Sequence, residues 1–219
     1  GFQEQLSDLF RHMPRDISVI LVSATMPQKV VALSEDFMRP NATRIMIDKE
    51  QIPVNSIRQF YVEIAKEDEK LVVIEDIYSA LSITQSIIFT NKRETAEYVA
   101  MSLRSKNYAV SLTHGDLSSQ ERSAIFSHFR GGKTRVLVTT DLIGRGIDVD
   151  KVNYVINYEL PSSSMEQYVH RIGRCGRCGR KGIAINLVQP REVCLLSEIE
   201  TAYRCKIAEL PIDFTSILE

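Results

Sequence analysis

The densest group of potentially reactive side chains lies in the segment HRIGRCGRCGRKG, residues 170–182. The segment holds four arginines and one lysine, and it contains no aspartate or glutamate. Arg171, Arg174 and Arg177 recur every three residues, with a glycine between each pair. Arginine is a forked, permanently charged donor that suits phosphate oxygens, and glycine allows close approach to the backbone. We expect a helix that begins near residue 164 to fray here and to aim the guanidiniums in one direction, as a clamp for an anion.

Two other interpretations of this segment stay open. Cys175 and Cys178 have the CxxC spacing of a zinc or redox site. However, Cys194 and Cys205 follow singly, which supplies no second CxxC, and a redox CxxC belongs at the start of a helix. An exposed, solvated loop would be richer in lysine and acidic residues. The composition therefore favours phosphate binding, and we predict no metal site.

Two further polar segments are predicted to follow buried strands. VTTDLIGRGIDV, residues 138–149, and THGDLSSQER, residues 113–122, both carry hydroxyls and carboxylates. Parallel strands present such loops together at the carboxyl edge of a sheet, where they can hold sugar or phosphate. The serines at 118 and 119 are equally explained as helix caps, and His114 as a structural histidine.

A third candidate, GGKT at residues 131–134, resembles the end of a phosphate-binding P-loop. Residue 127 is serine where the P-loop pattern needs glycine. A helix is predicted before the segment and a strand after it, which is the reverse of the P-loop context. We therefore predict a plain turn in which Gly132 can approach a phosphate through its backbone.

The elements that position these segments alternate regularly from about residue 55. Short β-branched runs predict strands, and amphipathic segments between them predict helices. The strands are expected at 57–64, 86–90, 108–112, 134–140, 152–158 and 182–188, and the helices at 67–80, 92–105, 118–130, 164–172 and 190–203. This alternation predicts an α/β fold with a mostly parallel sheet covered by helices on both faces.

The first part of the chain repeats the scheme on a smaller scale. Helices near 2–13 and 28–38 flank a predicted strand, SVILVSA, at 18–24. One strand with two helices cannot bury a core, so we interpret residues 1–40 as the trailing segment of a separate domain. Prolines, asparagines and charges favour a linker at 41–54, which leaves 55–219 as the main domain.

The composition fits a folded intracellular protein, cytoplasmic or nuclear. The chain has 219 residues, 44% hydrophobic and 25% charged, with four cysteines and a formal net charge of −1. Overall charge therefore cannot attract a nucleic acid, and any anion binding must come from local clusters. The sequence shows no apolar run near 18 residues and no signal peptide, so we expect no membrane association.

Taken together, the motifs resemble those of DEAD-box RNA helicases. SAT (23–25), IIFTN (87–91), HGD (114–116), TTDLIGRGIDV (139–149) and HRIGRCGR (170–177) follow one another in the order of that family. IRQFY, LSITQSIIF and GRKGIAIN resemble its initiation factor 4A branch. The resemblance implies a RecA-like parallel sheet, the second lobe of a helicase core, preceded by a fragment of a first RecA-like lobe. The P-loop and the Asp-Glu-Ala-Asp motif do not occur in this sequence, so we expect the chain alone not to hydrolyse ATP.

The resemblance also implies roles for individual residues toward ATP with Mg²⁺. Arg174 and Arg177 correspond to arginines that reach the γ-phosphate, and Asp148 to the residue that holds the ribose. Ser23 and Thr25 correspond to hydroxyls that couple nucleotide state to lobe closure. The magnesium ligands are expected in the first lobe, outside this sequence. The expected catalytic and nucleotide-binding residues are Ser23, Thr25, Gly146, Asp148, Arg174, Arg177 and Cys178.

Toward RNA, the resemblance implies contacts with phosphate and ribose and therefore binding without sequence preference. The expected RNA contacts are Asn91, Gly115, Arg122, Gly132 and Thr140. An interlobe network is expected from Asp116, His170 and Arg171. The family also implies a possible HEAT-repeat scaffold partner and a monomeric protein.

Four positions depart from the pattern of the family. Ser119 stands where relatives carry glutamine, Lys92 where they carry threonine and Gly144 where they carry alanine. Cys178 replaces an aromatic residue that can stack on adenine, which predicts weak nucleotide affinity that Cys178→Tyr would raise.

The function implied is an ATP-dependent RNA helicase that unwinds short duplexes when its two lobes close, in translation initiation or mRNA processing. One alternative is a non-catalytic scaffold module with a helicase-like fold. A DNA-directed enzyme of the wider superfamily is a second alternative.

Overall fold

The computed structural model describes residues 2–14, 16–23, 28–45, 54–81, 83–141, 151–176, 182–211 and 213. The chain divides into two compact units, Gly1–Ile47 and Asp48–Glu219. The division falls within the linker predicted at 41–54. Each unit is described by itself.

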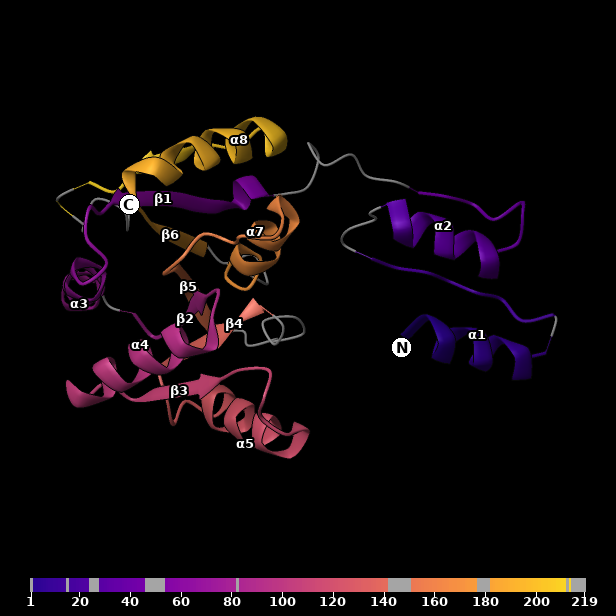
Figure 1. Ribbon diagram of the computed structural model, residues 1–219, viewed down its shortest axis with the longest axis horizontal. Coiled ribbons are helices and arrows are strands. Elements are labelled where there is room, and N and C mark those ends of the chain that lie inside the picture. The colour runs from indigo at the N-terminus through magenta and orange to yellow at the C-terminus, as the bar shows by residue number, and fades with distance from the viewer. Residues whose placement is uncertain are drawn as a thin grey trace. The chain divides into compact units, whose positions relative to one another are not determined.

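The second unit is built on a seven-stranded sheet in the order β3-β4-β2-β5-β6-β1-β7, and every recorded strand pair is parallel (Figure 1). Six strands agree with the prediction, with ends that differ by one or two residues. The seventh, β7, was missed because three residues are too short for a recognisable alternation; it is held by β1. The strands are β1 Ile57–Glu63, β2 Gln85–Thr90, β3 Val110–Thr113, β4 Val136–Thr140, β5 Val152–Asn157, β6 Gly182–Val188 and β7 Ile207–Glu209.

Helices cover both faces of this sheet, as predicted. Figure 1 shows α3 and α4 on one side of the strands and α5 and α7 on the other. All five predicted helices are present. Two short 3₁₀ turns accompany them: η2 Val54–Ser56 precedes β1, and η3 Pro190–Glu192 leads from β6 into α8. The helices are α3 Glu69–Ala80, α4 Arg93–Ser105, α5 Ser119–Arg130, α7 Met165–Ile172 and α8 Val193–Tyr203.

Two hydrophobic clusters form the core, one on each face. Successive side chains of a strand point to opposite faces. In β2, accordingly, Ile88 packs with α3 and α4, whereas Ile87 and Phe89 pack in the cluster that includes α7 and α8. The continuous apolar runs of the strands therefore reflect a sheet that is buried on both sides, which confirms the predicted fold class.

The N-terminal unit contains two helices, α1 Phe2–His12 and α2 Gln28–Phe37. Phe10 and Phe37 stack between them with ring centroids 4.5 Å apart. The predicted strand at 18–24 is wrong for its described residues, 18–23, which do not pair as a strand. A strand needs a neighbour for its backbone hydrogen bonds, and the described part of this unit contains none. Ile20 and Val22 are consequently 85% and 87% exposed.

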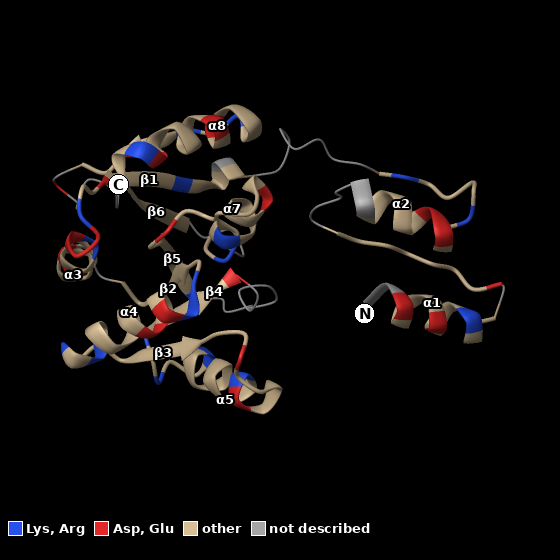
Figure 2. Ribbon diagram, viewed as in Figure 1, with Lys and Arg blue, Asp and Glu red and all other residues tan. Residues whose placement is uncertain are grey.

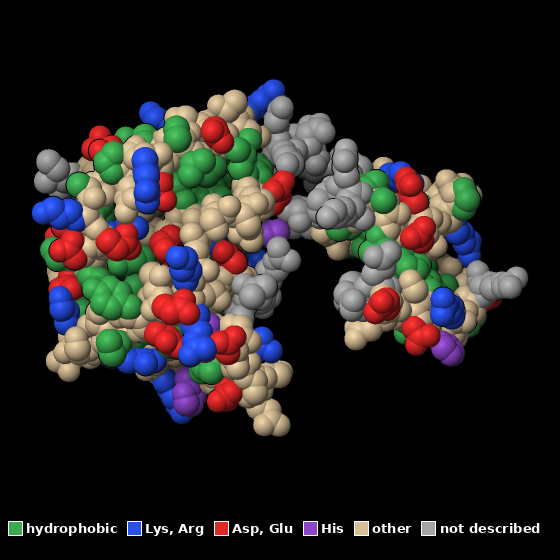
Figure 3. All heavy atoms as spheres, viewed as in Figure 1, with side chains coloured by type: hydrophobic (Ala, Val, Ile, Leu, Met, Phe, Trp, Pro, Cys, Tyr) green, Lys and Arg blue, Asp and Glu red, His purple; other side chains and the backbone are tan. Residues whose placement is uncertain are grey.

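Charges of both signs are mixed on the face of the second unit that the figures show. Figure 2 shows basic and acidic residues interspersed along its helices, and Figure 3 shows apolar patches broken up by charged side chains. This mixture agrees with the net charge of −1 and leaves local clusters as the places where an anion can bind. Within the described residues, no helix is long and apolar enough to cross a membrane.

Candidate nucleic-acid interface

A polar hollow of about 320 Å³ opens at the carboxyl edge of the sheet in the second unit. It lies where β2, β3 and β4 end, and the loop between β5 and α7 closes one side. The parallel register brings these ends together, since Thr90 pairs with Thr140 and Thr113 with Thr139. The lining residues are Asn91, Arg93, His114, Gly115, Asp116, Thr140, Asp141, Ser162, Ser163 and Gln167.

Three of the five predicted RNA contacts meet in this hollow: Asn91, Gly115 and Thr140. Arg122 lies in the first turn of α5, the helix that begins at the same edge. Gly132 does not join them, because it precedes β4 and lies at the amino end of that strand, with φ +77°. The contact of Gly132 with RNA stays a prediction.

Arg171 is the organising residue beneath the hollow. Its side chain is 1% exposed, and its guanidinium also lies over the Phe89 ring, 5.4 Å from the centroid. Nε and Nη2 donate to the two carboxylate oxygens of Asp141, each at 2.5 Å. Nη1 donates to the Glu159 carbonyl at 2.6 Å and to the Asn157 side chain at 3.3 Å, and Nη2 also donates to the Asn91 side chain at 2.7 Å. All five N–H donors of the guanidinium are therefore used.

This arrangement fixes Asn91 from both ends. Its Oδ1 accepts from Arg171, while its Nδ2 donates to the Leu160 carbonyl at 2.8 Å. Its backbone N–H donates to the Glu159 carboxylate at 2.7 Å. Asn91 is thus presented to the hollow in one orientation, by one partner on α7 and two on the loop that follows β5.

We predicted that the guanidiniums of Arg171, Arg174 and Arg177 point in one direction to bind an anion, and this prediction is wrong for Arg171. α7 ends at Ile172, so the helix buries Arg171 before the chain turns. Arg174 lies beyond that end, half-buried, and its Nε donates to the His170 carbonyl at 3.0 Å. The described partners of Arg171 all belong to its own unit, and its role in an interlobe network stays a prediction, as does that of His170.

The turn after α7 is packed closely against the start of β6. A Cβ added at Gly182 would lie 2.7 Å from the backbone nitrogen of Gly176 and 2.9 Å from Sγ of Cys175. Burial raises the pKa of the Cys175 thiol to about 12. Cys175 therefore acts as a small apolar residue that packs in the turn after α7 against the start of β6. The close approach at Gly182 was not predicted from the sequence.

A second ionic cluster lines the hollow at its surface. Arg93 donates to Asp116 at 2.5 Å and to Glu97 at 2.8 Å. Both carboxylates raise the pKa of Arg93, and Glu97 has the larger effect. Nε2 of His114 lies 3.7 Å from Glu97. Asp116 therefore pairs within this unit, while its predicted interlobe contact stays a prediction. Arg93 was missed in the sequence, although its position directly after a strand end was a usable signal.

The other predicted site residues are placed as follows. Ser23 is described and exposed, in the segment that does not pair as a strand. Five residues lie outside the described part of the chain: Thr25, Gly146, Asp148, Arg177 and Cys178. Among the described residues, no group of three or more His, Cys, Asp or Glu could hold a metal ion.

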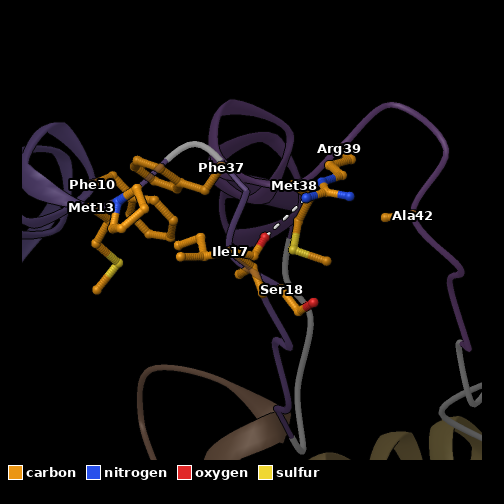
Figure 4. Close-up of a pocket in the computed structure, with 10 residues that line it drawn as sticks. Phe10, Met13, Ile17, Ser18, Phe37, Met38, Arg39 and Ala42 are labelled. Carbon is orange, nitrogen blue, oxygen red and sulfur yellow. Dashed lines mark hydrogen bonds between the residues drawn. The ribbon is translucent and has the colours of Figure 1, made fainter.

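The N-terminal unit has a hollow of its own, also of about 320 Å³. Figure 4 shows Phe10, Phe37 and Ile17 grouped on one side of it, and Arg39 donating to the Ile17 carbonyl at 3.2 Å. Its lining is mainly apolar, and Arg39 is the single charged side chain among the lining residues that the structure describes. Such a lining lacks the convergent polar groups of the hollow in the second unit.

Comparison with known proteins decides the family. Residues 69–179, half of the chain, match the helicase conserved C-terminal domain. The chain belongs to this family. Within it, the chain is 48% identical over 218 residues to a probable eukaryotic initiation factor 4A of Trypanosoma brucei brucei, and 45% identical over 217 residues to an ATP-dependent RNA helicase eIF4A of Scheffersomyces stipitis. The alignments cover 100% and 99% of this chain, but only 53% and 54% of the two relatives. The chain therefore spans about half the length of these relatives.

Solved structures give the same family assignment. Dbp5 of S. cerevisiae bound to RNA and ADP BeF3 is 34% identical, with a TM-score of 0.88 over 100% of this chain and 57% of that one. The C-terminal domain of the DEAD-box protein Dbp5 is 37% identical, with a TM-score of 0.67 over 75% of this chain and 96% of that domain. These matches confirm the resemblance to DEAD-box helicases of initiation factor 4A type and the RecA-like second lobe.

Proposed function

We propose that this chain is part of an RNA-dependent ATPase and helicase. Residues 55–219 would form its second lobe, and residues 1–40 would be a segment of its first lobe. The observation that carries the proposal is the polar hollow, in which the hydroxyl, amide and backbone groups of Asn91, Gly115 and Thr140 converge at one sheet edge. Such groups suit phosphate and ribose and do not read base edges. We therefore propose RNA binding without sequence preference. The likeness to Dbp5 bound to RNA supports RNA as the ligand.

For ATP, the described part of the chain offers Arg174, whose guanidinium chemistry fits a phosphate. We propose that Arg174 and Arg177 bind the γ-phosphate, that Gly146, Asp148 and Cys178 contact the nucleoside, and that Ser23 and Thr25 couple it to lobe closure. ATP supplies the phosphoanhydride bond that is hydrolysed. The magnesium ligands are proposed to lie in the first lobe.

The test is phosphate release by a protein that carries both lobes, measured with and without a single-stranded oligouridine. We expect RNA to stimulate release, and Arg177→Ala to abolish the stimulated rate, since an arginine of this kind contributes about 10³–10⁵ in rate. Arg130→Ala is the matched control, because Arg130 is an exposed arginine in the last turn of α5. Phosphate release that is absent with every RNA would instead identify a binding scaffold.

A DNA oligonucleotide of the same length tests the remaining alternative, because stimulation of phosphate release by DNA alone would place the protein among DNA-directed enzymes.

We further propose an intracellular monomer that binds a protein scaffold, of which a HEAT-repeat protein is one form. Sedimentation of the protein with both lobes would report the monomer directly.

A further inference from the structure

Buried side chains form a continuous series of hydrogen bonds that leads away from Arg171 through the sheet. Nη1 of Arg171 donates to Oδ1 of Asn157 at 3.3 Å, and Nδ2 of Asn157 donates to Oδ1 of Asn186 at 2.7 Å. The two asparagines occupy paired positions of β5 and β6, and both are 0% exposed. Polar side chains buried this deeply in a sheet destabilise the fold unless each is fully hydrogen-bonded.

The series continues on the far side of Asn186. Its Nδ2 donates to the Phe60 carbonyl at 2.8 Å and to the Tyr168 hydroxyl at 3.2 Å. The Tyr168 hydroxyl donates to Oε1 of Gln59 at 2.8 Å, and Nε2 of Gln59 donates to the Val54 carbonyl at 3.2 Å. We call Asn157, Asn186, Tyr168 and Gln59 the buried relay.

The buried relay has one direction, because both ends are fixed. A backbone carbonyl only accepts, so the contact with Phe60 forces the NH₂ of Asn186 toward Phe60 and its oxygen toward Asn157. Asn157 must then donate to Asn186 and turn its own oxygen toward Arg171. The reversed amide would place an NH₂ group against a guanidinium, which has no acceptor.

We propose that Asn157, Asn186 and Tyr168 are positioning residues for the hollow. They hold an acceptor against Arg171, and Arg171 in turn holds Asn91 and Asp141 at the lining of the hollow. The effect on RNA rests on the proposed function; the effect on the geometry of Arg171 and Asn91 does not.

The test uses the whole chain and three variants of the buried relay. Asn157→Leu keeps the branched shape without donor or acceptor. Asn157→Asp keeps an oxygen toward Arg171, and only its neutral acid form can still donate to Asn186. Tyr168→Phe removes one hydroxyl and keeps the ring. Tyr78→Phe is the matched control, because its hydroxyl bonds Ser86 at 2.5 Å on the opposite face of the sheet, outside the relay.

Two quantities are measured at a temperature where every variant is folded. Nitrogen-15 NMR gives the side-chain amide signal of Asn91 and the exchange rate of the Arg171 Nε–H with water. Fluorescence anisotropy gives the affinity for a labelled ten-nucleotide oligouridine. The NMR readout does not depend on RNA, so a wild-type chain that fails to bind the oligouridine counts against the proposed function alone.

We expect Asn157→Leu to shift the Asn91 signal, to speed Arg171 exchange about tenfold and to weaken RNA binding about fivefold, which corresponds to one lost buried hydrogen bond. Tyr168→Phe should change the Asn91 signal, the Arg171 exchange rate and the RNA affinity in the same direction, but by less. If Asn157→Leu does not fold, Tyr168→Phe alone tests the proposal. Asn157→Asp stays nearer to wild type than Asn157→Leu, because it keeps the acceptor for Arg171, and Tyr78→Phe stays within about twofold of wild type. The proposal is overturned if Asn157→Leu and Tyr168→Phe both leave Arg171 exchange unchanged, or if Tyr78→Phe speeds this exchange as much as they do.

Discussion

At the scale of single residues, burial separates two arginines that make similar contacts at the same edge. Arg171 and Arg93 each bind a carboxylate at 2.5 Å, but Arg171 is 1% exposed and Arg93 is 50% exposed. Water competes for the exposed pair and cannot reach the guanidinium of the buried one. The ion pair of Arg171 beneath the hollow therefore stabilises the fold, whereas the ion pair of Arg93 at the surface contributes little to stability.

We expect Arg171→Ala to lower the free energy of unfolding by about 3–5 kcal/mol, because Asp141 and the acceptors around it lose their shared donor. Arg93→Ala, the matched control, should cost less than about 1 kcal/mol, as exposed ion pairs do. Urea unfolding followed by circular dichroism measures both. Equal losses in the two variants would contradict the assignment of Arg171 as the organising residue.

The described cysteines allow a second prediction at this scale. Cys194 is exposed, whereas the buried Cys175 has its pKa raised to about 12. At pH 8 the reactive thiolate of Cys175 amounts to about 10⁻⁴ of the population. Iodoacetamide followed by peptide mass spectrometry should therefore label Cys194 first and Cys175 only on unfolding. Rapid labelling of Cys175 in the folded protein would show that the turn after α7 opens.

At the scale of the elements, strand ends were predicted well because each polar segment follows a recognisable apolar run. Gly115 and Thr140 could be assigned to one edge on that basis, whereas Asn91 was expected only from the resemblance to the helicase family. The burial of Arg171 could not, because it depends on Asp141, Asn157 and Glu159 meeting in space. The failed strand at 18–24 has the opposite cause, since its apolar pattern is correct but a strand forms only beside a partner.

Helix starts differ in a way that can be tested. Ser118 caps α5 in a capping box with Glu121, whose pKa is lowered by the hydrogen bonds from the Ser118 hydroxyl and backbone. Lys92 occupies the same position before α4, in extended geometry and without a side-chain cap. We expect Lys92→Thr to raise the free energy of unfolding by about 0.5–1 kcal/mol, since threonine can cap the helix. Lys92→Ala is the control, because it removes the charge without adding a cap, and an equal gain from it would exclude capping as the cause.

At the scale of the whole chain, the two units differ in what holds them together. Every member of both hydrophobic clusters lies between Val54 and Leu210, within the second unit. In the first unit, α1 has 11 residues and α2 has 10, which is shorter than isolated helices need to be stable in water. The second unit should therefore fold without the first, whereas the first should not fold alone.

We expect a chain of residues 48–219 to unfold at a midpoint within about 2 °C of that of the full 219 residues, a change in the free energy of unfolding of at most about 1 kcal/mol. A chain that begins at residue 65 is the control. It lacks β1, which pairs with both β6 and β7, so it should show no cooperative transition. A peptide of residues 1–47 should show little helix by circular dichroism. If removing residues 1–47 instead abolished the cooperative transition, as removing β1 should, the core of the second unit would not be self-contained, and the first unit would have to supply part of it.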